Sequence, residues 1–409
     1  MRLEFELWWL LAIPLLFALG WLSARLDLKN LLSESRALPR SYFRGLNFLL
    51  NDQPDRAVDA FIDVVRLSPE TVELHFALGN LFRRRGETER AIRVHQNLLN
   101  RQDLPLRQQE QALFELGQDF LKAGLYDRAE EAFTKLQEGR YQAESLAGLL
   151  DIYQRSKEWH QAVDVAQRLR GDDSRLFDSQ IAHFYCELAE EALQEQNYKG
   201  AEKFLNLARL ENTHSVRAMI LMGDVLTQQH QHDKAIAVWR EIEATPEYLP
   251  LVAERLLIAH KALGQQSAGL NLLRGYLAQS KSEELFDLVF TATLAFDGAE
   301  SAEVLAQTQL TKTASLSALD RLLEAEIAKL PALDAAVTSA QLSDNIAASS
   351  AVALDGELLQ LIQTTLSKQR GRGARYLCSH CGFKAKRFYW QCPGCNDWDT
   401  YSPLRRTND

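Results

Sequence analysis

Four of the five cysteines in this 409-residue chain lie within eighteen residues of one another near the carboxyl end. Cys378 and Cys381 form one Cys-x-x-Cys pair, and Cys392 and Cys395 form a second pair after ten intervening residues. Two such pairs can place four thiolates at the corners of a tetrahedron around one metal ion. This clustering is typical of a metal site rather than of a disulfide framework.

One zinc ion is the expected occupant, because four cysteines in a reduced compartment most often bind zinc, and iron is the alternative. The Cys-x-x-Cys-Gly and Cys-Pro-x-Cys turns are similar to those of rubredoxin. A rubredoxin-like electron carrier is therefore an alternative to a domain in which the metal ion has only a structural role. Gly382 and Gly394 are predicted to supply the turn conformations that a side chain resists. His380 and the isolated Cys186 are interpreted as incidental rather than as ligands.

Such a small domain has too little core to fold by itself, so the ion is expected to supply its stability. Phe383, Trp390 and Trp398 are predicted to pack around the ion. Residues 368–409 carry nine Lys/Arg against three Asp, a balance of +6, which leaves −15 for the rest of a chain whose net charge is −9. The negative net charge of the chain argues against nucleic-acid binding by its whole surface. Because residues 368–409 are basic, a zinc-ribbon module that binds nucleic acid is an alternative function for this segment.

The long middle of the chain contains an internal repeat. Gly45 and Gly79 are separated by thirty-four residues, and so are Phe48 and Phe82. Related copies follow around Gly117 and Gly223, and we count six repeats with one or two further degraded ones. The pattern looks like the tetratricopeptide repeat, a pair of antiparallel helices that cross closely where a small residue removes the side chain. We therefore predict an all-α repeat superhelix over residues 38–280.

First-helix positions of such repeats line the inner wall of the array, which usually binds segments of other proteins. On this basis the partner-binding residues are predicted to be Asn80, Arg83, Arg84, Phe114 and Gln118, with Lys122 and Asp224 as further positions. Ordinary solvated surface is the alternative for each of them. Residues 281–369 retain a helical pattern and are interpreted as degenerate repeats that close the array, before the rubredoxin-like domain at 370–409.

The amino-terminal segment from Leu7 to Ala24 contains no charged residue and could span about 27 Å as a helix. Residues 1–24 are predicted to form a single transmembrane anchor, and 25–37 a juxtamembrane linker. Positive charge follows the apolar segment, so the carboxyl side is expected to face the cytoplasm. A cleaved signal peptide is the alternative, because Ala18-Leu19-Gly20 resembles a cleavage site.

The order of these parts, ending in YLCSHCGF and YWQCPGCNDWDT, resembles the lipopolysaccharide assembly protein B family of Gram-negative bacteria over the whole chain. The knuckle alone is also similar to the zinc ribbon of a RadA-type DNA-repair ATPase. That enzyme needs a Gly-x-x-x-x-Gly-Lys-Ser/Thr loop, which is absent here. No His-Glu-x-x-His or Gly-x-Ser-x-Gly motif occurs either, so the chain is not expected to be an enzyme.

The resemblance implies a bacterial inner-membrane adaptor in lipopolysaccharide regulation. Members of that family help the membrane protease FtsH degrade the deacetylase LpxC, and their rubredoxin-like domain is thought to pack against the repeats. The implied partners are FtsH, LpxC or other lipopolysaccharide assembly and transport proteins, and a homo-oligomer is compatible with the pattern. The resemblance transfers the four cysteines directly, but it does not identify the residues that contact a partner.

Overall fold

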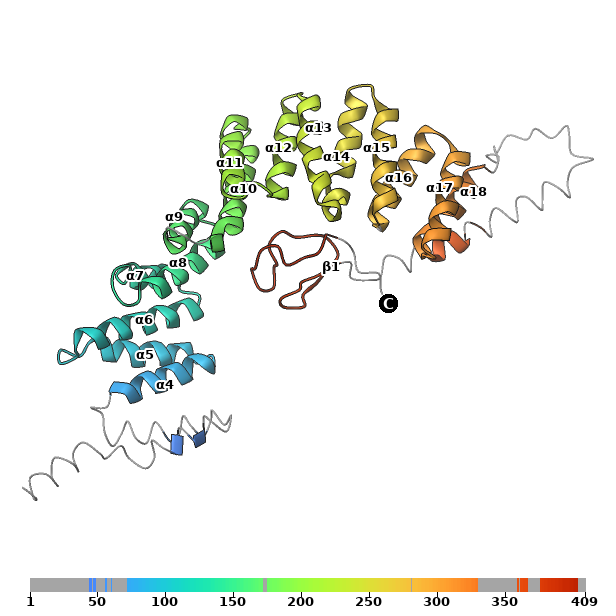
Figure 1. Ribbon diagram of the computed structural model, residues 1–409. Helices are drawn as coiled ribbons and strands as arrows, with labels where there is room; N and C mark the ends of the chain where they lie inside the picture. Colours follow the sequence, from blue (N-terminus) through green and yellow to red (C-terminus); the bar gives the residue numbers. More distant parts are fainter. Residues whose placement is uncertain are drawn as a thin grey trace, which may run out of the picture. The chain divides into compact units, whose positions relative to one another are not determined.

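The computed structural model describes residues 72–171, 175–280, 282–329 and 376–403, with a few further positions within 44–60 and 359–366. The predicted anchor at 1–24, the linker at 25–37 and the Arg-Gly segment at 370–373 lie outside these residues. None of the helices in the described part of the chain is long and apolar enough to cross a membrane. The chain divides into two compact units, 1–157 and 158–409, which are described separately (Figure 1).

The first unit is built from consecutive helices, each packed on the next. These are α4 (Val72–Arg84), α5 (Thr88–Leu99), α6 (Leu106–Lys122), α7 (Tyr126–Thr134) and α8 (Gln142–Ser156). Glu89 and Asp127 lie in the first turns of α5 and α7, where a carboxylate stabilises the positive end of the helix dipole. Both helices are the second helices of their repeats, so the same device stabilises the start of the second helix in these two copies.

The second unit continues the helical pairs and ends in a small hairpin. Its helices are α9 (Trp159–Arg170), α10 (Asp178–Gln194), α11 (Tyr198–Glu211), α12 (Val216–Gln228), α13 (His232–Arg240), α14 (Leu249–Ala262), α15 (Gln266–Gln279), α16 (Glu283–Phe296), α17 (Ala299–Lys312) and α18 (Leu316–Lys329). Short 3-10 turns occur at Arg175–Phe177, Glu241–Ala244 and Pro246–Tyr248. The mostly helical, tetratricopeptide-like fold predicted from the period is confirmed.

In three of the repeats, a glycine in the first helix lies against a ring of the second helix. A Cβ added to Gly117 would lie 2.7 Å from the Phe133 ring, and one added to Gly223 would lie 2.1 Å from Trp239. In both pairs the ring follows the glycine by sixteen residues, and the same spacing joins Gly79 to His95. The backbone of the first helix thus contacts the ring directly, which fixes the crossing of the two helices.

The carboxyl-terminal knuckle, residues 376–403, is held by a two-stranded antiparallel sheet of β1 (Tyr376–Leu377) and β2 (Lys384–Ala385). Isolated bridges join Cys378 to Tyr401 and Gln391 to Trp398. Its own buried residues are Tyr376, Cys378, Ala385, Cys392 and Tyr401, with Phe388 and Tyr389 packed against them. This interior is small, which agrees with the expectation that the knuckle needs further stabilisation.

The predicted packing of Phe383, Trp390 and Trp398 around the metal site is wrong for both tryptophans. Trp390 packs against the hydrophobic core of the repeats, and Trp398 stacks on His183 of α10. Phe383 lies beside the Gly394 turn but remains 43% exposed. The tryptophans project outward because the hairpin interior is already filled by tyrosine rings, and the repeats offer a larger apolar surface.

Candidate functional site

The four clustered cysteines of the knuckle converge on one point. The Sγ atoms of Cys378 and Cys395 are 3.8 Å apart, those of Cys381 and Cys392 are 3.6 Å apart, and all four lie within 4.8 Å of one another. Tetrahedral zinc with Zn–S bonds of about 2.3 Å separates its sulfurs by about 3.8 Å. The residues present therefore fit a four-coordinate thiolate site for a single ion.

Backbone N–H groups in the two turns donate hydrogen bonds to the cysteine sulfurs. The N–H of Cys381 donates to Cys378 Sγ, and that of Gly394 donates to Cys392 Sγ, each at 3.4 Å. Gly382 has φ +73°, a conformation that favours glycine. Gly394 serves a different purpose, because an added Cβ would approach Phe383 within 3.2 Å.

The thiols respond unequally to this environment. Burial acts to raise the pKa of Cys378, but hydrogen bonds from the Cys381 backbone and the Thr400 side chain outweigh it and lower the pKa to about 6. A hydrogen bond from the Asp397 backbone acts to lower the pKa of Cys395, yet burial and the three neighbouring cysteines raise it to about 12. Four thiolates cannot share this space without a compensating cation, so the donor set is suited to a metal ion.

The surroundings of His380 and Cys186 indicate that neither residue is a ligand of the metal site. His380 Nδ1 contacts the Asp397 carboxylate across the two turns, and these groups lie near Cys395. Because the four cysteines already complete a tetrahedral set, His380 is not needed as a ligand. Cys186 is fully buried in α10, where desolvation raises the pKa of its thiol to about 12, so this thiol behaves as a small core residue.

Trp398 is the centre of the contact between the knuckle and the repeats. Its ring stacks on His183 with centroids 4.7 Å apart and planes 14° apart, and Phe184 meets it edge-on at 6.1 Å. The Arg217 guanidinium lies 5.6 Å from the ring centroid, within the range of a cation–π contact. Arg217 also bonds to Glu187 at 2.7 Å and to Glu190 at 2.9 Å, which holds its charge in place.

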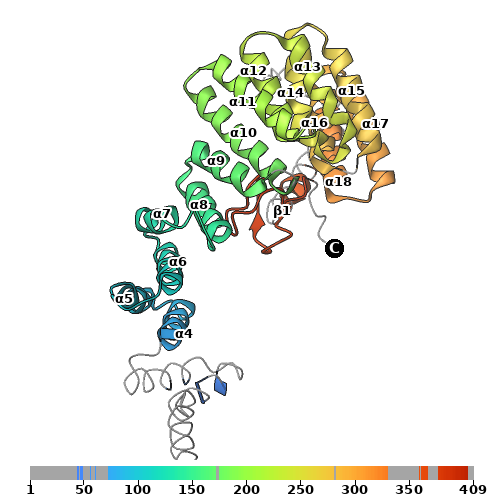
Figure 2. The same ribbon diagram turned by 60° about the vertical axis from the view of Figure 1, so that its left-hand side comes forward.

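Figure 2 shows the knuckle beside α10. Four further side-chain contacts fix its orientation there. The Asp399 carboxylate bonds to His183 Nε2 and to the Ser179 hydroxyl, both at 2.9 Å. Trp390 stacks on Tyr248 at 5.9 Å, and the Tyr376 hydroxyl donates to Glu284 at 2.9 Å. The metal site is thereby attached to the repeat helices through aromatic, ionic and hydrogen-bond contacts at once.

Sequence reasoning missed the repeat residues that receive the knuckle. They are Trp159, Ser179, His183, Phe184, Arg217, Tyr248 and Glu284. One signal was available, because a domain with so small an interior cannot cover two tryptophans by itself and needs a partner surface. The location of that surface could not be predicted from the sequence, because its residues come from five separate elements. These are α9, α10, α12, the Pro246–Tyr248 turn and α16.

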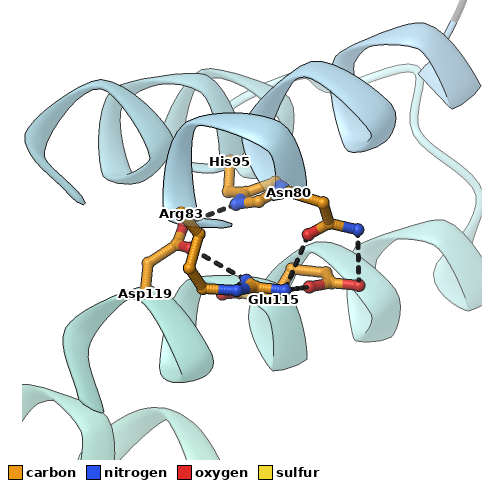
Figure 3. A network of polar contacts seen from close by, with 5 residues as sticks. All are labelled: Asn80, Arg83, His95, Glu115 and Asp119. Carbon is orange, nitrogen blue, oxygen red and sulfur yellow. Dashed lines mark hydrogen bonds and ion pairs between the residues drawn. The ribbon is translucent and has the colours of Figure 1, made fainter. Parts of the chain in front are cut away.

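Two of the predicted partner-binding residues take part in a polar network within the first unit (Figure 3). Arg83 of α4 donates to Glu115 at 2.6 Å and to Asp119 at 2.8 Å on α6, and it also contacts Asn80 at 2.7 Å. Asp119 is fully buried and contacts His95 Nδ1 of α5 at 2.5 Å. Asn80 and Arg83 therefore join α4 to α6, and His95 connects α5 to the same network through Asp119.

The other predicted positions are more varied. Arg84 is exposed, Gln118 is half-buried, and Phe114 stacks on Tyr141 with centroids 4.9 Å apart. Asp224 of α12 accepts a hydrogen bond from Arg255 Nε at 2.7 Å. Binding of a partner by any of these residues stays a prediction.

Comparison with known families agrees with this architecture. A model described as a rubredoxin metal binding domain matches residues 376–403, and a tetratricopeptide repeat model matches residues 74–110. The fold and the four-cysteine site thus define a tetratricopeptide-repeat protein with a carboxyl-terminal rubredoxin-like metal-binding domain.

Curated relatives identify the family more closely. Lipopolysaccharide assembly protein B of Escherichia coli (strain K12) is 33% identical over 97% of this chain and 97% of its own length. The protein of the same name from Haemophilus influenzae is 29% identical over 96% of this chain and 97% of its own length. The chain belongs to the lipopolysaccharide assembly protein B family, as its sequence resemblance predicted.

Proposed function

We propose that this protein is a non-enzymatic scaffold, anchored in the bacterial inner membrane and facing the cytoplasm, that promotes degradation of the deacetylase LpxC by FtsH. The observation that carries the proposal is the full-length match to proteins named for lipopolysaccharide assembly. Helical repeats joined to a metal-binding knuckle support it further, because such arrays act by presenting surfaces to other proteins.

In physical terms the scaffold works through effective concentration. A repeat array tethered beside a membrane protease holds a weakly bound substrate near the protease without any new chemistry. The bound ion, which we propose to be zinc, would stabilise the knuckle and so preserve the surface that Trp398 and Trp390 form with the repeats.

The test is the lifetime of LpxC in cells. LpxC should persist several-fold longer in a strain lacking this protein, and the wild-type chain should restore rapid decay. The double variant Cys378→Ser/Cys381→Ser should fail to restore it, whereas the matched control Cys186→Ala, which changes a cysteine of the repeat core, should succeed. An LpxC lifetime that is the same with and without the protein would disprove the proposed function.

A further inference from the structure

The inner-face positions of α10 and α12 line a cavity of about 490 Å³. Asp224, Thr227 and Gln228 follow Gly223 by one, four and five residues, as Asn80, Arg83 and Arg84 follow Gly79. These are therefore equivalent positions in two different repeats. The cavity is completed by Leu193 and Gln194 at the end of α10, with Gln196 and Tyr198 at the turn into α11. Its volume lies within the range of about 300–1,000 Å³ typical of ligand sites.

The polar side chains around the cavity fall into a bonded group and an unbonded group. Asp224 accepts a hydrogen bond from Arg255, and the Thr227 hydroxyl donates to the Gly223 carbonyl. Around the cavity, the side chains of Gln194, Gln196, Gln228 and Tyr198 form no hydrogen bond with any other residue that the structure describes. Their amide and hydroxyl groups are thus available to an incoming molecule.

The electrostatic character of the cavity favours a positive charge. Helices α10 and α12 both end at its wall, with Gln194 and Gln228 as their last residues, and a helix carboxyl end has a partial negative charge. The Asp224 carboxylate adds to this charge, and no lysine or arginine lines the cavity. Arg255 bonds to one Asp224 oxygen, yet burial still raises the pKa of this carboxyl, so a further cation beside it would be stabilising.

We propose that this cavity binds an extended polypeptide segment that directs a lysine or arginine side chain toward Asp224. Primary amides carry a donor and an acceptor side by side, so Gln194 and Gln228 can bond to the N–H and C=O groups of a peptide backbone. Both glutamines are exposed, which lets a long chain enter and leave the cavity. The inference rests on the proposed function, because the segment belongs to the protein that the scaffold holds.

The first test uses the purified full-length chain and two randomised peptide pools that differ only in a central arginine or glutamate. The arginine pool should bind at least about tenfold more tightly than the glutamate pool. Asp224→Asn should remove this preference, and Gln194→Ala/Gln228→Ala should weaken binding of the arginine pool about tenfold. The matched control Gln279→Ala, an exposed glutamine at the end of α15, should change nothing. Equal melting temperatures would show that all variants are folded.

Equal binding of both pools, or binding unaffected by the cavity variants, would overturn the proposal. Tighter binding of an uncharged oligosaccharide than of the arginine pool would overturn it as well. The LpxC lifetime assay separates this outcome from failure of the proposed function. If the cavity variants restore LpxC decay as well as the wild type does, the scaffold function stands and the cavity is not where it holds LpxC.

Discussion

The helical repeats and the knuckle reach a stable structure in different ways. In the repeats, three helical pairs are closed by a contact between a glycine and a ring sixteen residues later, as in Gly117 with Phe133 and Gly223 with Trp239. In the knuckle, two of the four cysteines, Cys378 and Cys392, are part of the small buried interior, and the outer rings lie against helices far away in the sequence. Asp399 contacts His183 across 216 positions, and Tyr376 contacts Glu284 across 92.

This difference indicates that the two regions should fail independently. Damage to a repeat should lower the stability of the helices around it, because each pair contacts only its neighbours. Damage to the metal site should unfold the knuckle while leaving the repeats helical. Damage to the contact between them should leave both folded but separate.

The largest expected effect follows from removing two ligands. Cys378→Ser/Cys381→Ser should abolish metal binding and unfold residues 376–403, because two hydroxyl groups cannot replace the lost thiolates. Elemental analysis and hydrogen exchange would measure both changes, and circular dichroism should retain the helical signal. Cys186→Ala should keep its metal. A double variant with full metal content would contradict the assignment of the site.

The close packing of the repeat helices can be tested by glycine-to-alanine substitutions, each of which adds one methyl group. Gly223→Ala should destabilise the protein by about 1–3 kcal/mol, because the new Cβ falls within 2.1 Å of the Trp239 ring. A Cβ added to Gly275 of α15 has no heavy atom within 4 Å. Gly275→Ala should therefore stabilise the protein by about 0.5–1 kcal/mol, because alanine favours the helical conformation more than glycine does. Urea unfolding measures both. If both substitutions changed the free energy of unfolding in the same direction, close approach of the first helix to the Trp239 ring would not be what stabilises the repeat.

The contact between the regions should respond to Trp398→Ala, which removes the ring that stacks on His183 and faces Arg217. The loss should be about 2 kcal/mol of docking energy, seen as faster hydrogen exchange in the knuckle and α10 with metal content unchanged. Phe383→Ala is the control, because that side chain is largely exposed. Equal rates of hydrogen exchange in the two variants would contradict the assignment of Trp398 as the main contact between the knuckle and the repeats.

The smallest effect is a pH dependence of the same contact. Burial acts to raise the pKa of Asp399, but bonds from His183 and Ser179 outweigh it and lower the pKa below its ordinary value. A lowered pKa stabilises docking above the ordinary value of about 4, and the contribution is lost as the pH falls through the lowered pKa. The difference in protease resistance between wild type and Asp399→Asn should therefore shrink as the pH falls below about 4. A difference that does not shrink in this acidic range would contradict the assignment to Asp399.

Several features were predictable because they depend on residues close in sequence. The four cysteine ligands follow from two short turns, and Gly382 adopts the left-handed conformation expected of it. The helical pairs follow from a period of thirty-four residues, with Gly223 and its equivalents at the crossing points. Asn80 and Arg83 were chosen by the same period, which gave their position on the helix but not their bonds to Glu115 and Asp119.

By itself, the sequence determined the repeat architecture and the metal-ligand set, since a fixed spacing brings those residues together in any copy of the same local fold. Only the tertiary structure decided that Trp398 would lie on His183 rather than over the cysteines. It also decided that Arg83 would bond to α6, whereas Thr227 at the equivalent position would line an open cavity. The reason is that these outcomes depend on what the neighbouring helices present, and no periodic pattern along one chain specifies contacts across hundreds of residues.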